Sequence, residues 1–116
     1  MKDIESIVFE IISNGGNAKG LIYEAISCSE RGDFKEADAL LEEADVYLTK
    51  AHKIQTELIQ QEASGNHNEV TILFVHAQDH LMTTMTLREV ALEMLGIYQK
   101  MSSLEEAIQC RSADGE

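Results

Sequence analysis

His76 and His80 stand four residues apart, a spacing that places both side chains on one side of a helix. Asp79 lies between them in the sequence, and Thr83 continues the same face. Neutral imidazole is a nucleophile near pH 7 and also a frequent metal ligand. This short stretch is therefore the candidate site for covalent chemistry or for ion binding.

The same residues also have simpler interpretations. A single histidine on a partly apolar face is more often a packed core residue than a catalyst. Two histidines at this spacing could share a transition metal, but the stretch lacks the glutamate of the HExxH motif and a nearby third ligand, which disfavours zinc. The other histidines are less informative, because His52 is expected at the surface or between helices and His67 in an exposed loop. The residue types and spacing alone name no reaction.

The composition favours a single helical domain. The chain has 116 residues, 44% of them hydrophobic, with no Trp and no Pro. Leu, Ile, Val, Ala and Met dominate the apolar set, and these residues pack helices against each other, while the absence of Pro leaves helices uninterrupted. We therefore expect an all-α fold, an antiparallel three-helix bundle.

Charge and cysteine content limit the possible partners and the compartment. The net charge is −12, which opposes binding to the phosphate backbone of nucleic acids. Cys28 and Cys110 show no metal-binding spacing and are expected to be unreactive thiols of a reduced intracellular protein. The acidic start of the sequence does not resemble a signal peptide, and no apolar run is long enough to span a membrane. We expect a cytoplasmic protein.

Apolar residues at helical spacing predict three helices, at about residues 3–30, 34–63 and 69–109, which together form one domain over residues 1–109. Residues 110–116 are polar and are expected to form a C-terminal tail. Ser, Gly, Asn and His residues at 64–68 mark the second connection.

Glycines at two places in the sequence, the pair at 15–16 and Gly32, bear on where the first helix ends. Gly15 and Gly16 each cost a helix about 1 kcal/mol relative to Ala. Either the helix breaks at this pair, or the glycines allow another backbone to approach closely. Because the apolar pattern continues across them, we expect a continuous or slightly bent helix. Gly32 is expected near the end of the first helix, with Asp33 as the N-cap of the second and Glu36 completing a capping box.

The third helix is apolar over an unusually wide face. One stripe is sufficient for a three-helix bundle, and it consists of Val70, Leu73, Phe74, Ala77, Leu81, Thr84, Leu87, Ala91, Leu95 and Tyr98. Further apolar residues extend well beyond this stripe: Ile72, Val75, Met82, Met85, Val90, Leu92 and Met94. The extra width predicts a second buried contact, most simply with other copies of the chain.

Four short motifs point to a known family: Gly16-Asn17-Ala18-Lys19, Gly32-Asp33-Phe34 followed by Ala37, Ala51-His52 with Gln55-Thr56, and Val75-His76-Ala77-Gln78-Asp79-His80-Leu81-Met82-Thr83. With them the chain resembles the enzyme IIA component of the lactose/cellobiose (N,N′-diacetylchitobiose) family of the bacterial phosphoenolpyruvate-dependent sugar phosphotransferase system. The resemblance runs from about Ile11 to Lys100. The last motif is specific and the others are supportive, while Gly20 departs from an expected Ser or other small residue.

The resemblance implies a site and an assembly. His76 would be the phosphorylated residue, and three chains would form a trimer through the third helix. Asp79 would face the trimer axis, where three copies would surround one divalent cation such as Mg²⁺, which favours oxygen ligands. His80, Thr83 and Gln78 would be neighbouring groups that orient the imidazole or bind the phosphoryl oxygens.

The resemblance also implies partners. The phosphoryl donor would be phosphorylated HPr and the acceptor a cysteine of the IIB component, with the membrane IIC component involved only indirectly. The protein would thus be a phosphotransferase component in the uptake of a cellobiose-, chitobiose- or lactose-type disaccharide. Two alternatives remain open at this point. A histidine phosphotransfer domain usually has a basic residue and Gly after its histidine, where this chain has Gln78, Asp79 and His80, and a non-catalytic helical interaction module needs only the apolar spacing and acidic surface.

Overall fold

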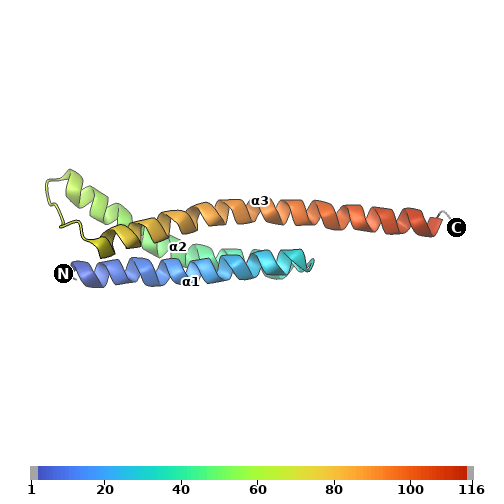
Figure 1. Ribbon diagram of the computed structural model, residues 1–116, viewed down its shortest axis with the longest axis horizontal. Coiled ribbons are helices and arrows are strands. Elements are labelled where there is room, and N and C mark those ends of the chain that lie inside the picture. Colours follow the sequence, from blue (N-terminus) through green and yellow to red (C-terminus); the bar gives the residue numbers. More distant parts are fainter. Residues whose placement is uncertain (1–2, 115–116) are drawn as a thin grey trace.

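The computed structural model describes residues 3–114, which form three helices (Figure 1). Helix α1 spans Ile4–Glu30, α2 spans Phe34–Ala63 and α3 spans Ile72–Asp114. The direction of the chain reverses between successive helices, so α1 and α3 run side by side in the same direction and α2 runs against both (Figure 1). The predicted all-helical fold with three helices is confirmed.

Helix α1 passes through its glycine pair without a break. At its start, the carboxylate of Asp3 accepts a hydrogen bond of 2.9 Å from the backbone N–H of Ser6, which caps the helix. Gly15 is buried and Gly16 exposed, so only one of the two faces the interior. The expected continuous helix is confirmed, because the apolar positions on both sides of the pair face the same core.

Helix α1 ends in a Schellman motif at its connection to α2. Gly32 has a φ of 83°, and the N–H of Asp33 donates to the carbonyl of Cys28 at 2.9 Å. Asp33 is the N-cap of α2, as expected, but its side chain makes no capping hydrogen bond. The predicted capping box with Glu36 is therefore wrong, because the backbone N–H of Asp33 that Glu36 would have to bind already donates to the carbonyl of Cys28.

The core lies where the three helices meet, and small residues bring the helices close together. Seven of the core positions are fully buried alanines: Ala18, Ala25, Ala37, Ala44, Ala51, Ala77 and Ala91. The largest fully buried side chains include Ile11, Ile22 and Leu81. The buried hydroxyl of Thr84 donates to the carbonyl of His80 at 2.7 Å, so this polar group is satisfied inside the helix.

Helix α3 starts later and ends later than the sequence pattern predicted. The hydroxyl of Thr71 accepts a hydrogen bond of 3.1 Å from the N–H of Phe74, which makes Thr71 the capping residue and excludes residues 69–71 from the helix. Val70 is consequently exposed outside the helix rather than part of its buried stripe. At the other end, residues 110–114, expected in a polar tail, continue the helix because no Pro or Gly interrupts them.

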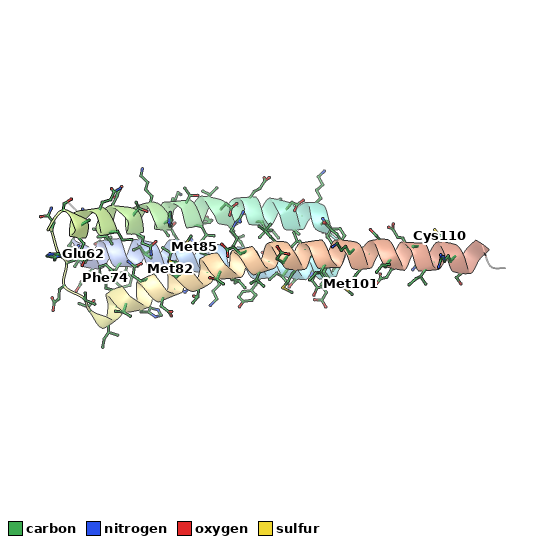
Figure 2. The ribbon with its side chains drawn as sticks, turned by 90° about the horizontal axis from the view of Figure 1, so that it is seen from above. Glu62, Phe74, Met82, Met85, Met101 and Cys110 are labelled. Carbon is green, nitrogen blue, oxygen red and sulfur yellow. The ribbon has the colours of Figure 1, made fainter. Side chains whose placement is uncertain are left out.

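Helix α3 extends beyond the other two helices (Figures 1 and 2). Leu95 is its last buried residue, and no described side chain from Gly96 to Ser112 is buried. Cys110 lies on this extension (Figure 2). Among residues 3–114, no helix combines the length and apolar character needed to cross a membrane.

A mostly apolar stripe runs along the side of α3 that faces away from α1 and α2. We call it the outer stripe, and its exposed apolar members recur at spacings that fit three- and four-residue steps: Ile72, Val75, Met82, Val90, Ile97, Met101, Leu104 and Ile108. Asp79, Thr86 and Glu93, all exposed, fill the intervening steps. The predicted surplus of apolar surface on the third helix is therefore present and is exposed in the single chain.

Candidate active site

His76 and His80 lie next to each other on α3. Their ring centroids are 6.2 Å apart, and the ring planes are inclined by only 10°. The two residues differ in environment, because His76 is exposed and His80 is half-buried. The His76 imidazole is accessible to a partner protein, while the His80 imidazole is partly covered by its neighbours.

Helix α1 contacts His80 through its glycine pair. A Cβ atom added to Gly15 would lie 3.1 Å from Cδ2 and 3.4 Å from Nε2 of His80, and one added to Gly16 would lie 3.7 Å from Nε2. The glycine pair therefore accommodates an imidazole side chain, rather than the backbone that we considered from the sequence. A larger residue at Gly15 would displace the ring.

The surroundings of His80 keep it neutral. Burial lowers the pKa of His80 below its ordinary value, with the positive charge of Lys19 and the neighbouring His76 acting in the same direction and Asp79 opposing them. Since the ordinary value is already below 7, the neutral form of His80 predominates at neutral pH. A neutral imidazole can accept a hydrogen bond at one ring nitrogen and donate at the other.

Asp79 and Thr83 are both exposed on α3. Asp79 belongs to the outer stripe and so points away from the bundle core. The hydroxyl of Thr83 donates to the backbone carbonyl of Asp79 at 2.8 Å and lies 3.2 Å from that of His80. Its only proton is thus engaged with the backbone, which leaves the hydroxyl oxygen as an acceptor.

Gln78 lies on another side of the helix, toward α2, where the side chain of Gln55 donates a hydrogen bond to its side-chain oxygen. The structure therefore does not bring Gln78 together with His76. His52 is exposed beside the ion pair that Arg88 makes with Asp45. His67 is exposed in the loop, 3.8 Å from Glu62, as expected from the sequence.

Lys19 is a residue near this site that the sequence argument did not single out. It stands one helical turn after Gly15 and Gly16, is half-buried, and exerts its charge on His80. The signal was present at the Gly16-Asn17-Ala18-Lys19 motif, because Lys19 and Gly15, the residue just before the motif, are four residues apart and share one face of a helix. The sequence does not reveal which element this face contacts, so it could not connect Lys19 to the histidines.

A single chain does not assemble a metal site within residues 3–114. No three His, Cys, Asp or Glu side chains among them gather closely enough to hold an ion. Asp79 offers one carboxylate, an oxygen ligand of the kind that Mg²⁺ prefers. This residue fits an ion only where several copies bring their carboxylates together.

Both thiols are free. Cys28 is buried against the core and Cys110 is exposed on the extension of α3. The thiol of Cys28 accepts a hydrogen bond of 3.3 Å from the guanidinium of Arg31. Neither thiol belongs to the histidine site.

Comparison with known proteins connects this chain to a family. Residues 6–99 match the family described as "PTS system, Lactose/Cellobiose specific IIA subunit". The lichenan-specific phosphotransferase enzyme IIA component of Bacillus subtilis is 46% identical over 101 residues, which cover 87% of this chain and 92% of that protein.

Two solved structures share the fold. The cellobiose-specific enzyme IIA of Bacillus anthracis superposes with a TM-score of 0.85 at 41% identity, covering 89% of this chain and 94% of that one. The chitobiose IIA protein of Escherichia coli, solved in solution in complex with HPr, gives a TM-score of 0.76 at 35% identity, covering 88% of this chain and 99% of that one.

Proposed function

Because this chain belongs to the lactose/cellobiose-specific IIA family of the sugar phosphotransferase system, we propose that His76 is its phosphoryl-accepting residue. One observation carries the proposal: an exposed imidazole lies nearly parallel to a neutral, half-buried one that is fixed against α1. The exposed ring is accessible to a donor protein, and its neighbour offers a hydrogen bond without adding charge. His80 is thus the group that orients the site.

The reaction is a pair of phosphoryl transfers. A ring nitrogen of neutral His76 attacks phosphorus in line, and the P–N bond of the phosphohistidine on HPr breaks as the new P–N bond forms. The HPr ring is protonated on its other nitrogen as the P–N bond breaks, so it leaves as neutral imidazole, while His76 gives up the proton of its second ring nitrogen. In the second transfer a cysteine thiolate of the IIB component attacks the same phosphorus, and the His76 ring takes up a proton as its P–N bond breaks and is released as neutral imidazole. The protein contributes positioning and charge stabilisation rather than covalent chemistry of its own.

We further propose that three chains associate through the outer stripe. Its three- and four-residue spacing is that of a coiled-coil seam, and a stripe of exposed apolar residues along a long helix is costly in water. Parallel packing of three α3 helices would cover it. The assembly would be cytoplasmic and would act in the uptake of a cellobiose-, chitobiose- or lactose-type disaccharide.

In such a trimer three Asp79 carboxylates would converge, and we propose that they hold one Mg²⁺ ion or a similar cation at the axis. Uncompensated, three like charges in a poorly solvated place repel each other strongly. The cation would offset this repulsion and play a structural role. The transfers are carried by a ring nitrogen of His76 and need no step at the ion.

The test uses phosphoenolpyruvate, enzyme I and HPr as the donor chain. Intact-mass measurement is expected to show one acid-labile phosphoryl group per chain in the wild type and none in His76→Gln. His67→Gln is the matched control, because it removes an exposed histidine in the loop. Full acceptance by His76→Gln, with loss of acceptance in His80→Gln, would transfer the role to His80 and refute the assignment.

A further inference from the structure

The face of α1 beside His80 presents a lysine, Lys19. Gly15 and Gly16 contact His80, and Lys19 stands four and three residues after them, on the same side of α1. Side chains on a helix lean toward its N-terminus, so the stem of Lys19 extends back toward the glycine pair and the ring of His80, on which its charge acts. The ring of His80 in turn lies 6.2 Å from that of His76.

Lys19 is available for a ligand. Its side chain is half-buried, and no carboxylate of residues 3–114 lies within ion-pair distance of it. Two other cationic side chains of the bundle do have partners: Arg88 binds Asp45, and the ammonium of Lys50 lies 5.7 Å from the ring centre of Tyr47. The four-carbon stem of Lys19 can lie along the helix surface while its ammonium reaches outward.

The chemistry at His76 requires a positive charge. A phosphoryl group in transfer carries negative charge on its three non-bridging oxygens, and enzymes stabilise it with fixed cations. Here the chain carries a net charge of −12, and Asp79 stands three residues from His76. The two charges of an axial Mg²⁺ would be more than offset by three Asp79 carboxylates, so the phosphoryl group needs a further cation beside His76.

We propose that Lys19 binds the phosphoryl oxygens while the group is on, or moving to, His76. This inference rests on the proposed function, and it adds a residue from α1 to a site otherwise built on α3. The ammonium donates hydrogen bonds to the oxygens as a compact point charge. The glycine pair serves the same contact, since the absence of a side chain at Gly15 lets the His80 imidazole lie close to α1.

The experiment compares two donors. Phosphoramidate is a small donor: a His76 nitrogen attacks its phosphorus, the P–N bond breaks and ammonia leaves. Since it needs no protein docking, it isolates the site from long-range attraction between proteins. Phosphorylated HPr is the second donor, and the rate of His76 phosphorylation is measured with both.

Lys19→Gln is expected to slow phosphorylation about 10- to 100-fold with either donor, the size of one lost charge-assisted contact. Lys19→Arg keeps the charge and is expected to stay within about threefold of the wild type. Lys19→Met keeps the apolar stem without the charge and should be as slow as Lys19→Gln. The matched control is Lys35→Gln, the same charge change at an exposed position near the start of α2, which is expected to leave the phosphoramidate rate unchanged.

Different outcomes refute the proposed function and the role of Lys19. A wild type that accepts no phosphoryl group on His76 would overturn the proposed function and this inference with it. A wild type that accepts the group, together with Lys19→Gln and Lys19→Met at the rate of Lys35→Gln, would overturn the role of Lys19 alone. Slowing with HPr but not with phosphoramidate would also overturn it, because the lysine would then act in docking.

Discussion

Replacing Gly15 by Ala tests the contact between α1 and His80. An alanine in a helix interior is favoured over glycine by about 1 kcal/mol. At Gly15, however, the new Cβ would lie 3.1 Å from Cδ2 of His80, so the ring must move by a few tenths of an ångström. We expect Gly15→Ala to gain clearly less than about 1 kcal/mol in the free energy of unfolding and to slow phosphorylation of His76.

Two controls on the same helix give the unopposed gain. At Gly20 nothing lies within 4 Å of an added Cβ, and at Gly16 the nearest atom is at 3.7 Å, an ordinary contact. Gly20→Ala and Gly16→Ala are therefore expected to stabilise the protein by about 1 kcal/mol each. Urea unfolding at one fixed protein concentration measures all three variants, since association makes stability depend on concentration.

A double-mutant cycle identifies the cause. In a His80→Ala background the ring is gone, so Gly15→Ala should gain as much as Gly20→Ala does. If Gly15→Ala has the same effect with and without the ring, or equals Gly20→Ala in the wild-type background, the glycine does not make room for His80. The account of how α1 positions the site would then be wrong.

Three other expectations concern assembly and core. Asp79→Leu should raise the melting temperature and abolish its dependence on EDTA and Mg²⁺, because it removes axial repulsion and adds apolar volume; equal losses on chelation in both proteins would place the ion elsewhere. The wild type should sediment at three times the chain mass of 12.9 kDa. Val90→Lys should dissociate the trimer, whereas Val46→Lys, a control at a similarly exposed valine of α2, should not; an intact Val90→Lys trimer would exclude the outer stripe as the interface. Leu81→Ala empties a fully buried position and should cost about 2–5 kcal/mol by urea unfolding; a loss under about 1 kcal/mol would contradict its place in the core.

The helical pattern of the sequence was sufficient for most of the architecture. Helix α2 occupies the range expected from its alternating apolar residues, and α1 continues through Gly15 and Gly16 because burial of one continuous face outweighs their low propensity. The errors lie at the ends of α3. Thr71 caps the helix through its side chain, and the apolar pattern alone did not distinguish this start from one at about residue 69. At the other end, polar composition alone did not end the helix at residue 109.

The site was predictable in part. Spacing placed His76 and His80 on one face, and the family match over residues 6–99 decides in favour of a IIA component over a histidine phosphotransfer domain or an interaction module. Spacing could not reveal that Gln78 turns toward α2 or that Gly15 contacts His80, since both depend on how the helices pack. The roles of Asp79 and Thr83 stay predictions.

The extension of α3 offers a convenient point of attachment for measurements. Cys110 is exposed there while Cys28 is 3% exposed, so a thiol-reactive dye or surface linker would select one position without any engineering. At about 1.5 Å of rise per residue, Cys110 stands about 50 Å along the helix from His76. It also lies two residues past Ile108, away from the outer stripe. A protein tethered at this thiol would keep its histidine face open to solution, so that binding of donor and acceptor proteins could be followed in real time on the native chain.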